Sequence, residues 1–175
     1  YDTNGDIFIA SRTDGIKKFD YATNTLDTNW ASNGSYMSWN RSSCYSYYMN
    51  DIVYHGGYIY AASYYSSYIY RMDVNTGACD MMNNRIYHRY PRALAVKNNK
   101  LYVVGNDGTG VYDLSKSTFP RIQNYNFPNY ARYAEPMTID ASGSHIYWYY
   151  DRRINTHKLN ANGTINTTRI AAPYY

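Results

Sequence analysis

Short runs of alternating aromatic and β-branched residues recur along the chain, each bounded by Gly, Asn, Asp or Ser. The clearest stretch is Gly57 to Gly77, where two Tyr/Ile runs flank a polar Ser-Tyr-Tyr-Ser-Ser break. Alternation with a period of two, ended by turn-forming residues, is typical of strands joined in a hairpin. This stretch therefore predicts two adjacent antiparallel strands.

The first of these two runs has counterparts at a regular spacing. The four copies cover residues 5–10, 57–62, 99–104 and 144–149. Their starts are about 42 to 52 residues apart, close to the roughly 40–50 residues that one four-stranded blade of a β-propeller occupies. The repeat therefore indicates blades of a propeller.

Two further sets of runs keep the same register. A second run, ending in Asp or Asn and leading into a turn, covers residues 15–20, 68–73, 110–113 and 153–160. A compact apolar run precedes the first run in three units, at residues 51–54, 93–96 and 137–140. Together they predict an all-β protein, a β-propeller of four-stranded antiparallel blades. About four blades are visible in one domain, at approximately 1–50, 51–90, 91–135 and 136–175.

The first unit has no compact apolar run before it. At the other end, Ala172-Pro173-Tyr174-Tyr175 resembles the lead-ins to two such runs, at Tyr90-Pro91 and Glu135-Pro136. Two interpretations fit this pattern. The chain is a segment of a longer propeller, or its two termini meet to close a four-bladed ring. We favour the longer propeller, because four-bladed rings are less common than larger ones.

Composition supports a packed all-β protein. The chain has 25 Tyr in 175 residues, and 45% of its residues are hydrophobic, which is enough for a core. Glu135 is the only Glu among 13 acidic residues, and Asp is more at home in turns than on helices. The net charge of +4 comes without a dense Lys/Arg stripe, so no nucleic-acid partner is expected. No apolar run approaches the roughly twenty residues of a membrane span.

Sequons and cysteines bear on the cellular compartment. Four Asn-x-Ser/Thr tripeptides make Asn33, Asn40, Asn162 and Asn166 candidate glycosylation sites. The two cysteines, Cys44 and Cys79, are disulfide candidates: they pair with each other, pair with partners outside this segment, or stay as buried thiols. We therefore predict a secreted protein or one at the extracellular surface.

Two stretches resemble known extracellular propellers. Residues 144–154 read Ser-His-Ile-Tyr-Trp-Tyr-Tyr-Asp-Arg-Arg-Ile and resemble the YWTD repeat of low-density-lipoprotein-receptor-type propellers, with Tyr149 in place of Thr and an extra Tyr150 before Asp151. Residues 51–60, continued to Gly77, are similar to a strand pair of the olfactomedin propeller. Both resemblances imply an extracellular binding or scaffold propeller, and neither assigns a functional residue.

Motifs for catalysis, metals and cofactors are missing from the sequence. It contains no Gly-x-Ser-x-Gly, P-loop, His-Glu-x-x-His or Gly-x-Gly-x-x-Gly. Asp2-Thr3-Asn4-Gly5-Asp6 looks like a Ca²⁺ loop, but the EF-hand positions for Gly and Glu hold Ile7 and Thr13. We expect no cofactor, no metal site and no enzymatic activity.

The loops between the first and second runs are the best ligand candidates, because such loops commonly face one end of a propeller. They carry Arg12 and Asp14 in the first unit. The candidate binding residues in the other units are Tyr64, Tyr65, Asn106, Asp107, Tyr150, Asp151 and Arg152. Aromatic faces beside Asn, Asp and Arg can stack on sugar rings or contact a protein surface.

The sequence thus favours a non-enzymatic module for protein interaction or structural assembly, with protein partners or self-assembly expected. The alternative is a lectin-like propeller that binds carbohydrate, so glycans are possible partners. A fragment of a propeller hydrolase or quinoprotein is a third hypothesis, and it needs a catalytic set that this sequence does not contain.

Overall fold

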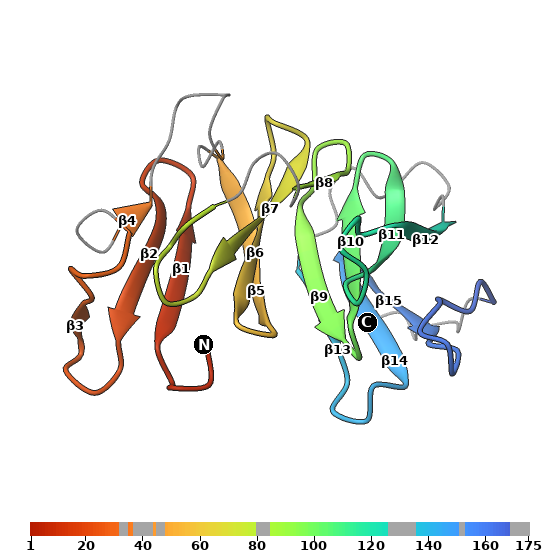
Figure 1. Ribbon diagram of the computed structural model, residues 1–175. Helices are drawn as coiled ribbons and strands as arrows, with labels where there is room; N and C mark the ends of the chain where they lie inside the picture. The colour runs from red at the N-terminus through yellow and green to blue at the C-terminus, as the bar shows by residue number, and fades with distance from the viewer. Residues whose placement is uncertain are drawn as a thin grey trace. The chain divides into compact units, whose positions relative to one another are not determined.

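The computed structural model describes residues 1–31, 35–36, 44, 48–79, 85–125, 136–150 and 153–168. The described chain is all-β, as predicted, and its strands form four antiparallel sheets (Figure 1). Within these residues there is no helix, and so none long and apolar enough to cross a membrane. The chain divides into two compact units, residues 1–87 and 88–175, and each unit is described by itself.

Unit 1 contains the first two sheets. The first sheet has β1 (Ile7–Ser11) beside β2 (Gly15–Asp20). Both β3 (Thr25–Leu26) and β4 (Ser35–Tyr36) pair with the far side of β2. The second sheet has the order β5 (Met49–His55), β6 (Tyr58–Ser63), β7 (Tyr68–Asp73) and β8 (Arg85–Tyr87). β1 lies next to β5, so the two sheets meet at these strands.

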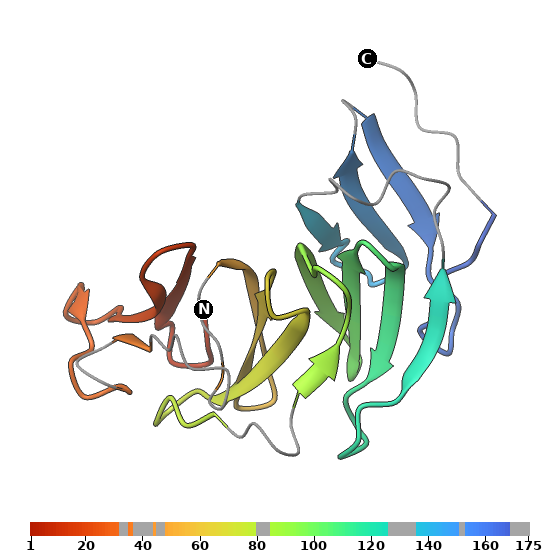
Figure 2. The ribbon, with the colours of Figure 1, turned by 90° about the horizontal axis from the view of Figure 1, so that it is seen from above.

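Unit 2 contains the other two sheets, which Figure 2 shows from above. The third sheet has the order β9 (Ala93–Lys97), β10 (Lys100–Gly105), β11 (Gly108–Asp113) and β12 (Arg121–Tyr125). The fourth has β13 (Met137–Ile139), β14 (His145–Tyr150) and β15 (Arg153–Lys158). β9 lies next to β13, so these two sheets also meet through their first strands.

The strands coincide with the three sets of runs in the sequence. The central strands β6 and β10 are buried on both faces over most of their length, which explains their nearly continuous Tyr, Ile, Val and Ala. Each unit has a core between its two sheets. Ile16, Trp30, Ile59 and Met72 are fully buried in unit 1, and the core of unit 2 includes Tyr102, Ile146 and Trp148.

Asp residues cap the turns that follow β2, β7 and β11, as the repeat predicts. The Oδ1 atoms of Asp20, Asp73 and Asp113 accept backbone N–H groups two or three residues further on, at 2.9–3.0 Å. Hydrogen bonds from Ser115 and Lys100 lower the pKa of Asp113 to about 2. These turns fix where β2, β7 and β11 end and where the connection to the next strand of the same sheet begins.

The two cysteines form a disulfide in unit 1. Cys44 and Cys79 are bonded to each other with a Cα–Cα distance of 6.2 Å. Cys44 is buried beside Trp30 and Met49 in the core, while Cys79 makes a β-bridge to Met72. The bond therefore ties the segment before β5 to the segment after β7.

Candidate functional site

Three loops of unit 1 meet at one end of its sheets. The first loop is the β1–β2 turn, which carries Arg12. The second is the connection that leads into β5 and ends at Tyr48. The third is the β6–β7 turn, which carries Tyr64 and Tyr65. The Tyr48 N–H donates to the Arg12 carbonyl at 2.9 Å, and the Tyr64 N–H donates to the Tyr48 carbonyl at 3.1 Å. Backbone bonds thus hold the four residues together, and we call them the tyrosine cluster.

The side chains of the tyrosine cluster pack on one another. The Tyr65 ring lies edge-on to Tyr48 at 4.5 Å between centroids and to Tyr64 at 5.2 Å. The guanidinium of Arg12 lies 5.6 Å from the centre of the Tyr48 ring, within the range of a cation–π contact. Edge-to-face pairs of this kind contribute about 0.5–1.5 kcal/mol beyond their buried area, so the rings are held in place.

The cluster still faces solvent. Tyr65 is 50% exposed, whereas Tyr48 and Tyr64 are half-buried. Rigid, half-exposed tyrosines lose little conformational entropy on binding and present both an apolar ring and a hydroxyl. The arrangement can therefore contact a protein surface or stack on a sugar ring.

Short polar side chains fix the two turns that carry the cluster. In the β6–β7 turn, Ser66 Oγ donates to the Ser63 carbonyl and accepts the Tyr68 N–H, both at 3.3 Å, and Ser67 has a φ of 61°. In the β1–β2 turn, Ser11 Oγ accepts the N–H groups of Thr13 and Asp14 at 3.3 and 3.2 Å. These bonds explain why a Ser-rich break separates the two Tyr/Ile runs.

The other predicted ligand residues lie in unit 2 or outside the described residues. Asn106 and Asp107 lie in the β10–β11 turn of unit 2, where Asp107 Oδ2 accepts the Arg89 N–H at 3.2 Å. Tyr150 is the last residue of β14, and Asp151 and Arg152 lie outside the described residues. The structure therefore groups Tyr64 and Tyr65 with Arg12, and adds Tyr48.

Sequence reasoning did not select Tyr48 as a binding residue. Tyr48 stands just before β5, at the end of a long Tyr-rich connection, and several of its neighbours there are also tyrosines. Its role depends on the bonds to Arg12 and Tyr64, which join positions far apart in the sequence. The only indication of a binding residue in this part of the sequence is the Tyr-rich composition of the connection, which does not distinguish Tyr48 from its neighbours.

A second polar centre, at the end of the first sheet, holds the ammonium group of Lys18. This group lies 3.0 Å from Asp6 and 2.9 Å from Asp27, and Lys18 is only 7% exposed. Burial by itself would lower the pKa of Lys18, but the hydrogen bonds that its ammonium donates to Asp27 and Asp6 outweigh this effect and raise the pKa. The hydrogen bond from Lys18 lowers the pKa of Asp27.

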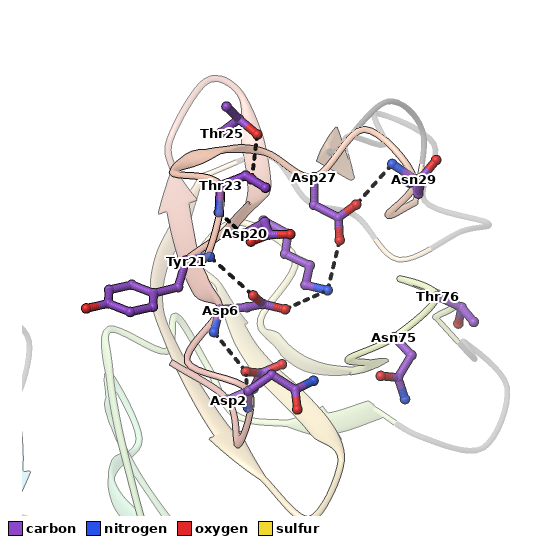
Figure 3. Close-up of polar contacts among 12 residues, drawn as sticks. Asp2, Asp6, Asp20, Tyr21, Thr23, Thr25, Asp27, Asn29, Asn75 and Thr76 are labelled. Atoms are coloured by element: carbon purple, nitrogen blue, oxygen red, sulfur yellow. Dashed lines mark hydrogen bonds and ion pairs between the residues drawn. The ribbon is translucent and has the colours of Figure 1, made fainter.

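The two carboxylates of this centre also bind backbone groups. Asp6 Oδ1 accepts the Tyr21 N–H at 3.3 Å, and Asp27 Oδ1 accepts the Asn29 N–H at 3.1 Å (Figure 3). The Lys18 ammonium forms ion pairs with both carboxylates. These ion pairs connect the turn before β1 to the segment after β3, so their role is structural. Among the described residues, no three His, Cys, Asp or Glu side chains are grouped so as to hold a metal ion.

Unit 2 contains a buried histidine beside a tyrosine and an arginine. The Nδ1 atom of His88 lies 3.0 Å from the Tyr112 hydroxyl and 3.3 Å from Arg121 Nη2. Arg121 also donates to the Tyr112 hydroxyl from Nε at 2.9 Å and from Nη2 at 2.6 Å. Burial, followed by the charge of Arg121, lowers the pKa of His88 to about 4. The fully buried imidazole of His88 is therefore neutral in the folded protein at neutral pH.

The candidate glycosylation sites fall in different surroundings. Asn162 is exposed in the turn after β15, whereas Asn166 is half-buried and its N–H donates to the Lys158 carbonyl at 2.8 Å. Asn33 and Asn40 lie outside the described residues.

No protein-family model matches the sequence, and no curated protein matches it at a significant level. Solved structures do match its fold. A functionally unknown protein from Desulfotomaculum acetoxidans aligns with a TM-score of 0.65 at 10% identity, over 87% of this chain and 47% of that chain. One chain of a mitotic checkpoint complex structure aligns with a TM-score of 0.66 at 9% identity, over 90% of this chain and 44% of that one.

The extracellular domain of a putative hybrid two-component system from B. thetaiotaomicron is also similar. It aligns with a TM-score of 0.67 at 14% identity, over 99% of this chain and 21% of that chain. At these identities the likenesses show the all-β fold alone. This chain spans less than half the length of each of the three proteins.

Proposed function

We propose that this chain is part of an extracellular β-propeller that acts as a non-enzymatic interaction module, with the tyrosine cluster as its contact surface. The observation that carries the proposal is the half-exposed Tyr65 ring, fixed against Tyr48 and Tyr64 beside the cation of Arg12. Tyr and Arg are the residue types enriched at protein-binding hot spots. Four antiparallel sheets at a blade-like repeat, with first strands adjacent in unit 2, support the propeller arrangement.

The extracellular assignment rests on three observations. The chain has a disulfide between Cys44 and Cys79, which forms in oxidising compartments. It carries four sequons. One of the similar structures is the extracellular domain of a putative hybrid two-component system.

Carbohydrate is the second candidate ligand. Tyr65 is half-exposed and packs on Tyr48, whose ring contacts Arg12 in the turn that also carries Asp14, so aromatic rings and charged hydrogen-bonding groups belong to the same group of loops. Sugar rings stack on aromatic rings while their hydroxyls bond to neighbouring polar groups.

One binding experiment tests both candidates. The labelled chain is applied to an array of extracellular proteins and to a glycan array, as wild type and as the Tyr64→Ala/Tyr65→Ala variant. Tyr21→Ala is the matched control, because Tyr21 is 70% exposed and lies in the β2–β3 turn outside the cluster. We expect the double variant to lose at least about tenfold in affinity for a bound protein, and Tyr21→Ala to keep it.

The two arrays separate the outcomes. Cluster-dependent binding to glycans alone replaces the protein-interaction proposal with the carbohydrate one. Binding that the double variant retains in full removes the tyrosine cluster from both proposals.

A further inference from the structure

A second pair of tyrosines extends the surface of the tyrosine cluster along the second sheet. Tyr68 begins β7, directly after the β6–β7 turn that carries Tyr64 and Tyr65, and Tyr87 of β8 lies opposite it. The two rings meet edge to face with 5.6 Å between their centroids. Tyr68 packs against the core of unit 1, whereas Tyr87 is 55% exposed. Aromatic rings therefore continue from the turn onto β8, the strand at one edge of the sheet.

An arginine contacts each of these two groups of tyrosines. The guanidinium of Arg12 lies 5.6 Å from the centre of the Tyr48 ring, and that of Arg85 lies 4.4 Å from the centre of the Tyr68 ring. Both arginines are exposed. Among the residues that the structure describes, no carboxylate lies within ion-pair distance of either guanidinium.

The lysines of unit 1, in contrast, already bind carboxylates. Lys18 is held between two aspartates, and the Lys17 ammonium lies 3.8 Å from the Asp14 carboxylate. Asp14 stands in the turn that carries Arg12, so Lys17 offsets the negative charge nearest in the sequence to this arginine. Arg12 and Arg85 are therefore the charges of this surface that a partner can neutralise.

An arginine above an aromatic ring is suited to binding a carboxylate. The face of the ring attracts the positive charge and orients the guanidinium. The N–H donors point outward in the plane of the group, where they can bind both oxygens of one carboxylate. The neighbouring exposed rings of Tyr65 and Tyr87 offer contact area to an apolar or aromatic side chain. The surface thus combines aromatic contacts with two positions for a negative charge.

We propose that this surface, formed by the tyrosine cluster together with Tyr68, Arg85 and Tyr87, binds an extended acidic segment of a protein partner. The inference rests on the proposed function, because it names the chemistry of the partner that the tyrosine cluster contacts. One Asp or Glu of the segment pairs with Arg12, a second pairs with Arg85, and an apolar or aromatic side chain between them packs on the tyrosines.

The geometry of the tyrosine cluster sets the spacing within the segment. The Tyr65 and Tyr48 rings are 4.5 Å apart, and the Arg12 guanidinium lies 5.6 Å from the Tyr48 ring. An extended segment advances about 3.3 Å per residue. The acidic residue on Arg12 and the side chain that packs on Tyr65 are therefore about two or three residues apart in the partner.

Peptide selection tests this chemistry. A library of random peptides is selected on the wild-type chain and, in parallel, on Arg12→Glu, Arg85→Glu and Lys116→Glu. Lys116 is the matched control for charge reversal, because it is exposed in the β11–β12 turn of unit 2. We expect the wild type and Lys116→Glu to enrich peptides that carry Asp or Glu about two or three residues from an aromatic or aliphatic residue. The two arginine variants should lose this enrichment.

The affinity of the most enriched peptide tests the contact itself. Fluorescence anisotropy should show a loss of at least about tenfold for Arg12→Glu and none for Lys116→Glu. Replacing the acidic residue of the peptide by its amide should weaken binding to the wild type but not to Arg12→Gln, since that variant has no charge for the acid to pair with. A merely structural role of Arg12 would leave both proteins equally sensitive to the amide.

The remaining outcomes overturn the proposal. Neutral or basic peptides that the Tyr64→Ala/Tyr65→Ala variant no longer binds remove the acidic segment and leave the proposed function intact. Acidic peptides that bind both arginine variants as tightly as the wild type remove the arginines as their contacts. If no peptide is enriched and uronic-acid or sulfated glycans bind through Arg12, the ligand is acidic carbohydrate. Enrichment that the tyrosine double variant retains removes the tyrosine cluster, and the proposed function fails with it.

Discussion

His88 shows how one buried side chain makes stability depend on pH. Its Nδ1 atom accepts a hydrogen bond from the Tyr112 hydroxyl or from Arg121, so the neutral ring fits its surroundings. A protonated ring would place a second positive charge next to the guanidinium. The folded state therefore holds the imidazole neutral at a pH where the unfolded chain already binds a proton.

We expect the free energy of unfolding to fall as the pH drops from about 6.5 towards 4. The pKa of His88 is about 4 in the folded state and 6.5 as a free side chain. The contribution of His88 is therefore fully present above pH 6.5 and is lost as acid protonates the unfolded chain. Urea unfolding at several pH values measures the slope. His88→Gln is expected to flatten it, and an unchanged slope in that variant would contradict the assignment.

Gly105 is expected to resist even the smallest side chain. A Cβ at this position would lie 2.6 Å from the His88 ring and 2.7 Å from the Arg89 carbonyl oxygen. Gly105 is not among the residues with positive φ, so without this crowding alanine would stabilise the protein slightly. We expect Gly105→Ala to destabilise instead, by about 1–3 kcal/mol in urea unfolding. If Gly105→Ala is as stable as the wild type or more stable, there is room for a Cβ atom at this position.

At the scale of elements, the disulfide links two segments that no strand pairing joins directly. Cys44 precedes β5 and Cys79 follows β7, with a sequence separation of 35 residues. A cross-link that closes a loop of this length restricts the unfolded chain and stabilises the native one by about 4 kcal/mol in the chain-entropy model. The disulfide thus links the segment before the first strand of the second sheet to the segment after its third strand.

We expect reduction of this disulfide to lower the urea midpoint of unfolding clearly. Cys44→Ser/Cys79→Ser should reproduce the midpoint of the reduced wild type, and reductant should leave the double variant unchanged. The variant thereby controls for other effects of the reductant. If the reduced and oxidised wild types unfold at the same urea concentration, the disulfide does not contribute to stability.

The strands could be predicted from the sequence because most of them alternate apolar and polar residues or are apolar throughout. β6 and β10 are buried almost throughout, and their pattern survives in the sequence as Tyr/Ile and Val runs. The outer strands were harder to place. β12 has one exposed or half-buried residue after another, so it has little hydrophobic period. The strands β3 and β4 are two residues long and both pair with β2, at different residues of it. Strands this short show no recognisable hydrophobic pattern.

The candidate site was predictable only in part, for a similar reason. Tyr64 and Tyr65 stand in a turn between two clear strands, so their exposure follows from local sequence. Tyr48 joins them through backbone bonds to Arg12 and Tyr64, which depend on how separate hairpins pack. A contact between loops of separate hairpins leaves no local pattern in a single sequence, so it could not be predicted.

At the scale of the whole molecule, the candidate glycosylation sites on the surface can be tested directly. Two sequons lie in the described part of unit 2, and their surroundings differ. Asn162 is exposed in a turn, and its Oδ1 accepts the N–H and the hydroxyl of Thr164 at 3.0 and 2.7 Å. Asn166 is tied to β15 through its N–H and through its carbonyl, which lies 2.9 Å from His157 Nδ1.

We expect a eukaryotic host that secretes this chain to attach a glycan to Asn162 in preference to Asn166. The turn leaves the Asn162 side chain open to a large enzyme and to a bulky product, whereas a glycan at Asn166 would have to be accommodated beside the last strand of the sheet. Intact-mass spectrometry should show Asn162→Gln lighter by one glycan and Asn166→Gln unchanged. Peptide-N-glycosidase treatment should remove the whole glycan from every form and convert the modified Asn to Asp, so that each form then has the mass of its polypeptide with that single change. An equal loss of mass in both variants would mean that modification precedes the pairing of Asn166 with β15, so that the folded surface does not select the site.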